Sequence, residues 1–405
     1  MRKTLTILSI IIVIALTGMA IWYYFFKTPG GVVGNPFNDA LPFGSGEGMD
    51  IPTTDNRQLT TEEGFGVSNG KPVESLFQVA SSPVAGAVLI GQGASTTVRY
   101  VDRATGHIYD TDLATLDTRK VTNTTLPKIY EAVFSSDGNR VIYRSLDERG
   151  GLENLAITLT PPDSPSIDTL YTSSATVLRG DIQEPIAGTG NNLFYIQEDT
   201  SSVVTSTFEG TGLRTILSSP FTAWRLNLFG NSLVAWTKAS SNVPGYAYSL
   251  NTSTGSLNKL LGPLNGLTVL PNPRGERVIS SYNDSGVLRL VVKNIQSEAV
   301  YELSPSTLAE KCVWGRATIA LVICGVPTNG VGGGEPDNWY KGITHFSDRI
   351  WKFDTDTTET IIESEPKSVY GVDIDATNLL LSQDDGYLIF INRNDLSLWA
   401  LKLVD

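Results

Sequence analysis

The sequence predicts an all-β fold behind one N-terminal transmembrane helix, and three observations carry this prediction. The 405 residues include 15 Tyr, 7 Trp, 14 Phe and 38 Gly, a composition suited to many short strands joined by tight turns. A strand–turn–strand pattern recurs after residue 74. A charge-free apolar segment occupies the N-terminus. Each of these observations is considered in turn below.

The recurring pattern is an apolar strand, a turn rich in Gly, Asn or Asp, and a second strand that is almost wholly apolar. Its seven copies are VAGAVLIGQ (84–92), VFSSDGNRVIY (133–143), AGTGNNLFYI (187–196), NLFGNSLVAW (227–236), PNPRGERVISSY (271–282), VWGRATIALVICG (313–325) and IDATNLLLSQ (374–383). The first core residues of the second strands, taken as markers, are Val88, Val141, Leu193, Leu233, Val278, Leu321 and Leu379. Their spacings are 53, 52, 40, 45, 43 and 58 residues. A blade of four strands uses about 40–50 residues.

Hairpins that follow the markers, such as RIWKFDTDTTETIIE (349–363), supply two more strands per repeat. We therefore expect a seven-bladed β-propeller over residues 75–405. LFQV (76–79) can serve as the first strand of its first blade, so the way in which the ring closes stays open. A pair of β-sandwiches is the alternative, but it does not readily explain seven repeats of one internal order.

The segment from Thr4 to Phe26 is 23 residues long and uncharged, and about 20 helical residues span a bilayer core. Arg2 and Lys3 precede it, so the positive-inside rule predicts a cytoplasmic N-terminus and an extracytoplasmic C-terminal region. We expect a transmembrane signal anchor at 1–27 and a flexible Gly/Pro-rich stalk at 28–74. A cleaved secretory signal is the alternative, and it exports the same domain.

The unit VFSSDGNRVIY, followed by outer hairpins carrying DTDTTE or NTSTGS, resembles the Tol-type periplasmic propeller repeat and the propellers of prolyl oligopeptidases and dipeptidyl peptidases. The segments EKCVWGRATIALVICGVP, DNWYKG and HFSDRIWKFD resemble uncharacterised membrane-anchored bacterial propeller proteins. The resemblance implies a fold and no activity. The peptidases carry their nucleophile in a G-x-S-x-G elbow of a separate domain, whereas the one G-x-S-x-G pattern of this sequence, GVSNG (66–70), lies in the Gly/Pro-rich stretch before the repeats.

Charge and histidine content narrow the function classes. The net charge of −12 disfavours nucleic acid as a partner. The two histidines, His107 and His345, are 238 residues apart and belong to no metal-ligand or triad spacing. Acidic residues cluster at Asp354, Asp356 and Glu359 and at Asp384 and Asp385, and we interpret them as turn residues. We expect no metal and no cofactor.

The two cysteines, Cys312 and Cys324, flank the turn of the sixth repeat. If that hairpin is centred near Thr318, the cysteines face each other across two strands, close enough for a disulfide. Oxidation is compatible with an exported location. We therefore predict a Cys312–Cys324 disulfide.

The longest interruption of the repeat, at 326–348, is the candidate binding loop. It combines a Gly-rich stretch with charged and aromatic residues, which are enriched where partners bind. The candidate residues are Glu335, Asp337, Trp339, Tyr340, Lys341 and His345. The alternative is a loop folded back over its blade with Trp339 buried.

The function expected from these features is a non-catalytic binding or scaffold module, held at the cell membrane and engaging another envelope protein, a peptide or a glycan. An extracytoplasmic carbohydrate-active enzyme is the alternative, and it requires two carboxylates about 5–9.5 Å apart in the central pocket. A sensor that signals through the helix is a third possibility, although only two basic residues precede the segment.

Overall fold

The computed structural model describes residues 75–163, 169–221 and 223–403. These residues belong to one compact unit of the chain, Glu62–Asp405. No helix within the described ranges is long and apolar enough to cross a membrane. The predicted anchor (1–27) and stalk (28–74) lie outside the described residues.

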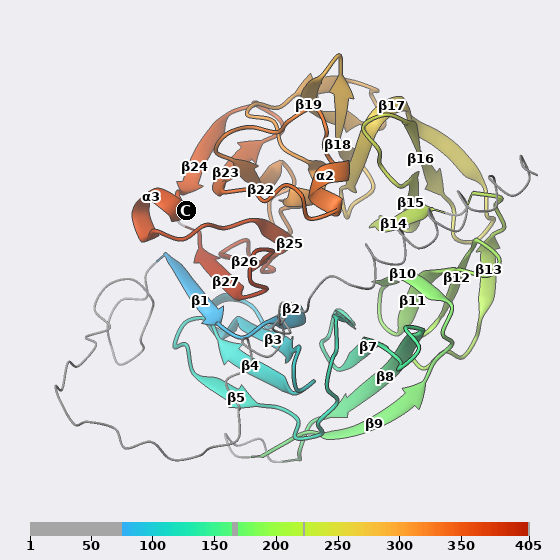
Figure 1. Cartoon of the computed structure of the whole chain (residues 1–405), viewed down its shortest axis with the longest axis vertical. Helices are drawn as coiled ribbons and strands as arrows, with labels where there is room; N and C mark the ends of the chain where they lie inside the picture. The colour runs from blue at the N-terminus through green and yellow to red at the C-terminus, as the bar shows by residue number, and fades with distance from the viewer. Residues whose placement is uncertain (1–74, 164–168, 222, 404–405) are drawn as a thin grey trace, which may run out of the picture. The chain divides into compact units, whose positions relative to one another are not determined.

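The all-β prediction is confirmed for the described part of the chain, where the strands form antiparallel sheets arranged around a common centre (Figure 1). One sheet contains β2 (Val84–Ile90), β3 (Thr97–Asp102), β4 (Ile108–Asp112) and β5 (Thr118–Lys120). The next contains β6 (Glu131–Phe134), β7 (Arg140–Leu146), β8 (Leu152–Thr160) and β9 (Thr172–Val177). A third contains β10 (Ile182–Ala187), β11 (Asn192–Gln197), β12 (Ser202–Thr207) and β13 (Arg214–Leu217).

A seven-stranded sheet follows, and one long strand joins its two halves. Its strands are β14 (Trp224–Phe229), β15 (Ser232–Thr237), β16 (Pro244–Leu250), β17 (Leu257–Pro271), β18 (Arg277–Asp284), β19 (Val287–Asn294) and β20 (Val300–Glu302). The first part of β17 pairs with β16 up to Asn265, and the remainder pairs with β18. Gly266, with a φ of +66°, bends the strand at this change of partner. Thus β17 is the last strand of one four-stranded set and the first strand of the next.

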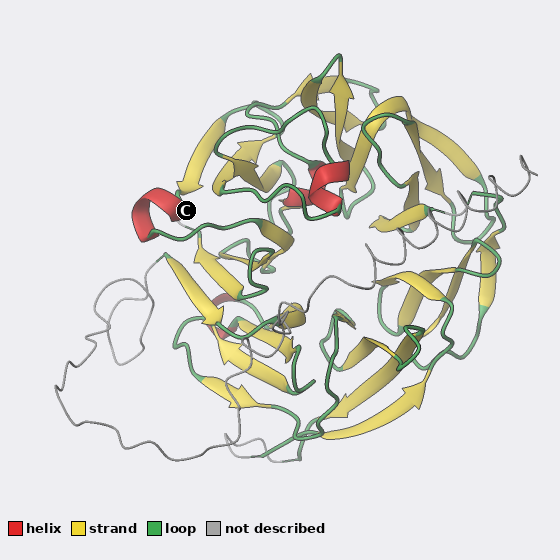
Figure 2. Ribbon diagram, in the orientation of Figure 1, coloured by secondary structure: helices red, strands yellow, loops and turns green. Residues whose placement is uncertain are grey.

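The remaining two sheets contain the C-terminal strands. One is formed by β21 (Cys312–Trp314), β22 (Leu321–Pro327), β23 (Asp348–Asp354) and β24 (Thr360–Ser364). The other is formed by β25 (Ala376–Leu381), β26 (Tyr387–Asn392), β27 (Leu398–Lys402) and β1 (Leu76–Ala80). Short helical turns lie between strands (Figure 2): η1 (Gly93–Ser95), η2 (Ala309–Lys311), α2 (Asp337–Tyr340) and α3 (Pro366–Tyr370).

The first described strand closes the ring of sheets. β1 pairs antiparallel with β27, with Phe77 opposite Ala400, so it is the outermost strand of the last sheet. The expectation that LFQV begins the first blade was therefore wrong. Leu76 and Phe77 are fully buried because they insert on either side of this edge, into the cores shared with the two neighbouring sheets.

Each sheet packs face to face against the next through apolar side chains. Phe77 and Val98 join the last sheet to the first, and Ile196 and Trp224 join the third to the fourth. All seven residues of β22 are buried, whereas all six of β9 are exposed. The apolar second strands therefore lie between neighbouring sheets, and the outermost strands face solvent.

Candidate binding site

The insertion between β22 and β23 folds back against the ring of sheets. The side chains of Trp339 and Glu335 are 4% and 3% exposed. Oε2 of Glu335 accepts a hydrogen bond from the Trp339 backbone N–H at 2.7 Å, and Oε1 accepts one from the Thr344 hydroxyl at 2.5 Å. The structure thus places these two candidate residues in the interior, as in the folded-back alternative.

The other candidate residues of the loop divide between contact with the ring and exposure. Asp337 is half-buried, and its Oδ2 accepts a hydrogen bond from a backbone N–H of the β15–β16 turn at 2.5 Å. The hydroxyl of Tyr340 donates to Oε1 of Glu310 at 2.7 Å. Lys341 and His345 are exposed. The six candidate residues therefore do not form one surface patch.

A buried charge cluster fastens this loop to the ring. Nζ of Lys311 lies 2.8 Å from Oδ2 of Asp348 and 2.5 Å from Oδ1 of Asp375, and all three side chains are fully buried. Nε1 of Trp339 donates to Oδ2 of Asp375 at 3.0 Å. The rings of Trp339 and Phe346 each lie 5.2 Å from the ammonium. The Lys311 ammonium thus interacts with two carboxylates and two aromatic rings.

Within this cluster, the carboxyl group of Asp348 is incompletely hydrogen-bonded. Its Oδ1 has no hydrogen-bond partner among the described residues. Burial raises the pKa of Asp348 to about 6, against the lowering effect of Lys311. The carboxylate of Asp348, which shares the Lys311 ammonium with Asp375, therefore gains a proton more readily than an ordinary Asp.

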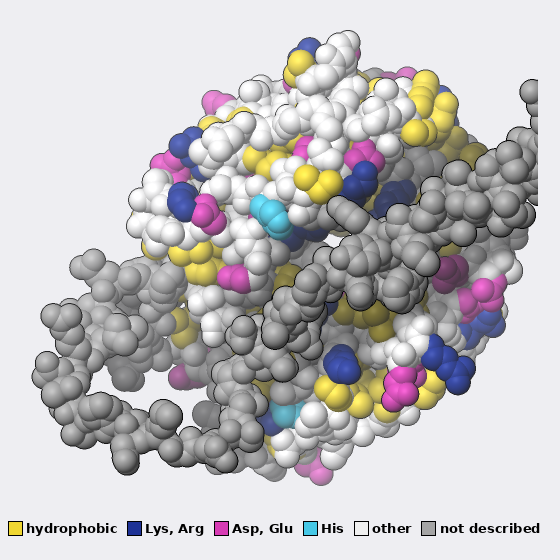
Figure 3. Space-filling view, viewed as in Figure 1, with side chains coloured by type: hydrophobic (Ala, Val, Ile, Leu, Met, Phe, Trp, Pro, Cys, Tyr) yellow, Lys and Arg dark blue, Asp and Glu magenta, His cyan; other side chains and the backbone are white. Residues whose placement is uncertain are grey.

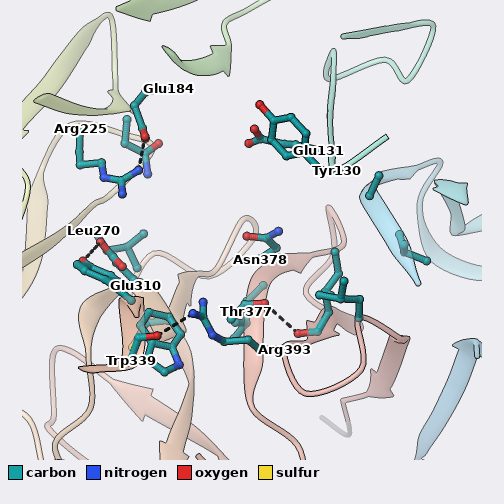
Figure 4. Close-up of a pocket in the computed structure, with 18 of the residues that line it drawn as sticks. Tyr130, Glu131, Glu184, Arg225, Leu270, Glu310, Trp339, Thr377, Asn378 and Arg393 are labelled. Atoms are coloured by element: carbon teal, nitrogen blue, oxygen red, sulfur yellow. Dashed lines mark hydrogen bonds and ion pairs between the residues drawn. The ribbon is translucent and has the colours of Figure 1, made fainter. Parts of the chain in front are cut away.

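A central channel of about 600 Å³ opens between the innermost strands. β2, β6, β10, β14, the second part of β17, β21 and β25 all contribute lining residues. The innermost strands lie close together: a Cβ added at Gly86 of β2 would lie 2.0 Å from the Ala132 carbonyl oxygen of β6. Side chains of several sheets converge on the channel in Figure 4.

Two of the carboxylates in the channel are already bound to arginines. Glu184 of β10 forms an ion pair with Arg225 of β14 (Figure 4). Glu131 of β6 forms one with Arg144 of β7, whose guanidinium also lies 5.5 Å from the ring of Tyr130. These pairs fix the charged side chains in place and connect neighbouring strands.

Glu310, the third carboxylate in the channel, has a raised pKa. Burial raises its pKa, although the Tyr340 hydrogen bond and the charges of Arg225 and Arg393 oppose the shift. The pKa of Tyr340 is raised well above its usual value by burial and by the neighbouring Glu310 charge. The channel therefore offers one weakly acidic carboxyl group that faces a phenol.

Two arginines in the channel wall lack a carboxylate partner within 4 Å among the described residues: Arg103 and Arg393. Arg393 is held by the candidate loop, since its Nη2 donates to the Trp339 carbonyl oxygen at 2.7 Å. Its guanidinium carbon lies 4.7 Å from the centroid of the Trp339 ring. The loop thus contributes to the site by positioning this arginine.

Sequence reasoning picked out two of the channel residues, Trp339 and Tyr340, and missed the charged ones, although a signal existed for three of these. Glu131, Glu184 and Arg225 are the charged residues of the mainly apolar first strands EAVF, IQEPIA and WRLNLF. First strands face the centre of the ring, so a charge there marks the channel. Arg103 and Arg393 lie in turns and show no such pattern.

The remaining sequence predictions concern single residues. Cys312 and Cys324 are directly opposite in β21 and β22 and form a disulfide of 2.09 Å. Asp354 accepts hydrogen bonds from the backbone N–H groups of 356 and 357, as a turn residue does, whereas Asp385 accepts three from 316–318, in the turn of another hairpin. His107 pairs with Thr125 at 2.9 Å. No group of potential metal ligands occurs within the described ranges.

Comparison with known proteins identifies the fold. No protein-family model and no curated protein matches the sequence. YCF48 bound to D1 peptide has a similar structure, with 12% identity over 82% of this chain and 96% of that chain and a TM-score of 0.51.

Two further solved structures are less similar. TolB from Acinetobacter baumannii aligns over 68% of this chain at 12% identity, with a TM-score of 0.42, and the match spans 62% of TolB, less than two thirds. Streptogramin B lyase aligns at 13% identity over 81% of this chain and 97% of that chain, with a TM-score of 0.49. The similarity to YCF48, together with the ring of antiparallel sheets, shows that the described chain is a β-propeller.

Proposed function

We propose that this chain is a membrane-anchored, extracytoplasmic, seven-bladed propeller that acts as a non-catalytic binding or scaffold module for an envelope protein, a peptide or a glycan. The uncharged segment Thr4–Phe26, preceded by Arg2 and Lys3, supports the anchor and its orientation. The two four-stranded sets that share β17, with the five other sheets, support seven blades.

The central channel is the observation that carries the binding proposal. It has about 600 Å³ of space, in the range of small-ligand and peptide sites, and every innermost strand contributes to it. Ion pairs and hydrogen bonds fix Glu131, Glu184, Glu310 and Arg393, so a ligand would meet a largely preorganised surface. YCF48, the similar propeller, is bound to a peptide, which is a fold-level analogy for such a role.

Filling the channel is expected to abolish partner binding. Asn227 of β14 is a half-buried lining residue, and Asn227→Trp would place an indole in the ligand's space. Val300→Trp is the matched control, because Val300 lies on the outermost strand β20 and is 56% exposed. Cross-linking in carbonate-washed membranes, followed by affinity purification of the full chain, measures recovery of the partner.

We expect Asn227→Trp to lower recovery at least about tenfold, the effect of losing roughly 1.4 kcal/mol or more of binding free energy. Val300→Trp should match the wild type. Equal recovery from all three proteins, or no specific partner of the wild type, would contradict the proposal. Loss of the chain from washed membranes would contradict the anchor.

One observation supports the alternative function, that of a carbohydrate-active enzyme. Glu310, with its raised pKa, has the property of a general acid for glycoside hydrolysis. The partner carboxylate would have to be Glu131 or Glu184, and each is engaged by an arginine. The non-catalytic proposal is preferred because neither of these groups is free to act as a nucleophile or base.

A further inference from the structure

The charges that line the channel are unevenly distributed among the sheets. The ion-paired carboxylates come from β6 and β10 and Glu310 comes from η2, whereas the two arginines without carboxylate partners come from the first and last sheets of the described chain. Arg103 follows β3, and Arg393 follows β26. Both turns join the second and third strands of their sheets. The two residues therefore occupy equivalent positions in neighbouring sheets.

Backbone contacts bring these two turns to the same end of β2. The N–H of Arg103 donates to the Pro83 carbonyl oxygen at 2.8 Å. The N–H of Val84, the next residue, donates to the carbonyl oxygen of Leu396 at 2.9 Å, in the turn that carries Arg393. Consecutive residues thus tie both turns to one end of β2, and both arginines line the channel.

Arg393 is oriented before any ligand binds. Its single described hydrogen bond, to the Trp339 carbonyl, uses one of the five N–H donors of a guanidinium. Trp339 is itself fixed by Glu335 and Asp375. Half-buried guanidinium groups with unused donors are suited to paired hydrogen bonds with a carboxylate.

The aromatic rings at the channel indicate which kind of carboxylate fits. A glycan site needs an open ring face on which a sugar stacks. Among the aromatic residues that line the channel, Trp339 and Tyr130 each have a guanidinium over one ring face. Trp236 is 6% exposed, and the ring of Tyr340 packs 5.9 Å from that of Trp339. Innermost strands also present backbone donors and acceptors to a chain in the channel, as peptide-binding edges do. These features favour an extended peptide over a sugar.

We infer that the channel binds a peptide segment through a carboxylate, either its C-terminus or an Asp or Glu side chain, held by Arg393 and Arg103. Glu131 and Glu184, each paired with an arginine, then face the remainder of the peptide, and their carboxylate oxygens can accept hydrogen bonds from it. This inference rests on the proposed function and specifies the ligand class of the same channel. Figure 4 shows Arg393 on the wall opposite Glu131 and Glu184.

Defined peptide pools test the inference on the detergent-solubilised full chain. One pool of 12-residue peptides has free C-termini, a second has amidated C-termini, and a third is amidated and lacks Asp and Glu. Bound peptides are identified by mass spectrometry, and their Kd values are measured by fluorescence anisotropy. A uronic acid oligosaccharide serves as the carboxylate probe that is not a peptide.

We expect binding from the first pool, from the second pool or from both, and none from the third. Which of the first two is preferred distinguishes a C-terminal from a side-chain carboxylate. Arg393→Gln and Arg103→Gln should each weaken binding about 10- to 100-fold, as for loss of a charged hydrogen bond. Arg214→Gln, on exposed strand β13, is the matched control and should change Kd less than about twofold.

Several outcomes would overturn the inference. Equal binding of the acid-free pool, or Kd values unchanged in both channel arginine variants, would exclude a carboxylate at this place. Arginine-dependent binding of the oligosaccharide alone would exclude a peptide. If one of these outcomes occurred but Asn227→Trp still abolished partner binding, the proposed function would be retained and only the inferred ligand class would be wrong. Arg103→Gln keeps the test valid should Arg393→Gln unfold, because Arg103 has no side-chain partner among the described residues.

Discussion

Replacing Lys311 with alanine is expected to lower the free energy of unfolding by about 3–5 kcal/mol, because two buried carboxylates would lose their shared cation. Lys311, Asp348 and Asp375 are all fully buried, so water cannot replace the missing ammonium. The rings of Trp339 and Phe346 would also lose a cation contact. Urea denaturation of the wild type and the Lys311→Ala variant measures the difference.

Lys352→Ala provides the matched control for this measurement. Lys352 is 40% exposed and lies 3.9 Å from a Glu363 carboxylate oxygen, so its ion pair should contribute less than about 1 kcal/mol. A Lys311→Ala protein as stable as the Lys352→Ala protein would show that the buried cluster does not fasten the loop.

The same cluster is expected to make the fold less stable as the pH rises from 4 to 6. The folded pKa of Asp348, about 6, lies above the ordinary value of 3.8 that the unfolded chain should show. Between these values the folded state binds more protons, so protonation stabilises it, and the contribution is lost as the pH passes through 6. About two pKa units correspond to roughly 3 kcal/mol.

Asp348→Asn isolates this contribution from other titrating groups. The amide oxygen can still accept the 2.8 Å hydrogen bond from the Ala376 N–H, but the side chain does not titrate. The difference in unfolding free energy between the wild type and the variant should therefore change between pH 4 and 6. Parallel stability curves over this range would show that Asp348 has an ordinary pKa in the folded protein.

Sequence periodicity predicted the strands well and their places in the sheets less well. Val141, Leu193, Leu233, Val278 and Leu321 lie in second strands, as predicted. Val88 and Leu379 lie instead in the first strands β2 and β25. First and second strands are both apolar, so a short apolar run cannot distinguish them. The place of β1 depends on closure between the two ends of the described chain, and no local pattern records it.

The sequence also predicted the candidate site only in part. The sequence singled out the 326–348 insertion from its composition, but Trp339 and Glu335 turned inward because Asp375 and a local backbone N–H satisfy their polar atoms. Arg103 and Arg393 are 290 residues apart, and the closure of the ring by β1 places the turns that carry them in neighbouring sheets at the channel. Local composition therefore predicted the insertion, whereas the closure of the ring determines which residues line the channel.

Photo-cross-linking from inside the channel tests the central claim most directly. A photoreactive amino acid at Asn227, introduced into the full chain in its native membranes, should form a covalent adduct with the partner on irradiation. The same residue at Val300, on the outer edge, should form none with that partner. Adducts from the channel position alone would agree with a ligand bound at the centre of the ring. Adducts from Val300 alone would place the partner on the outer edge and contradict the account.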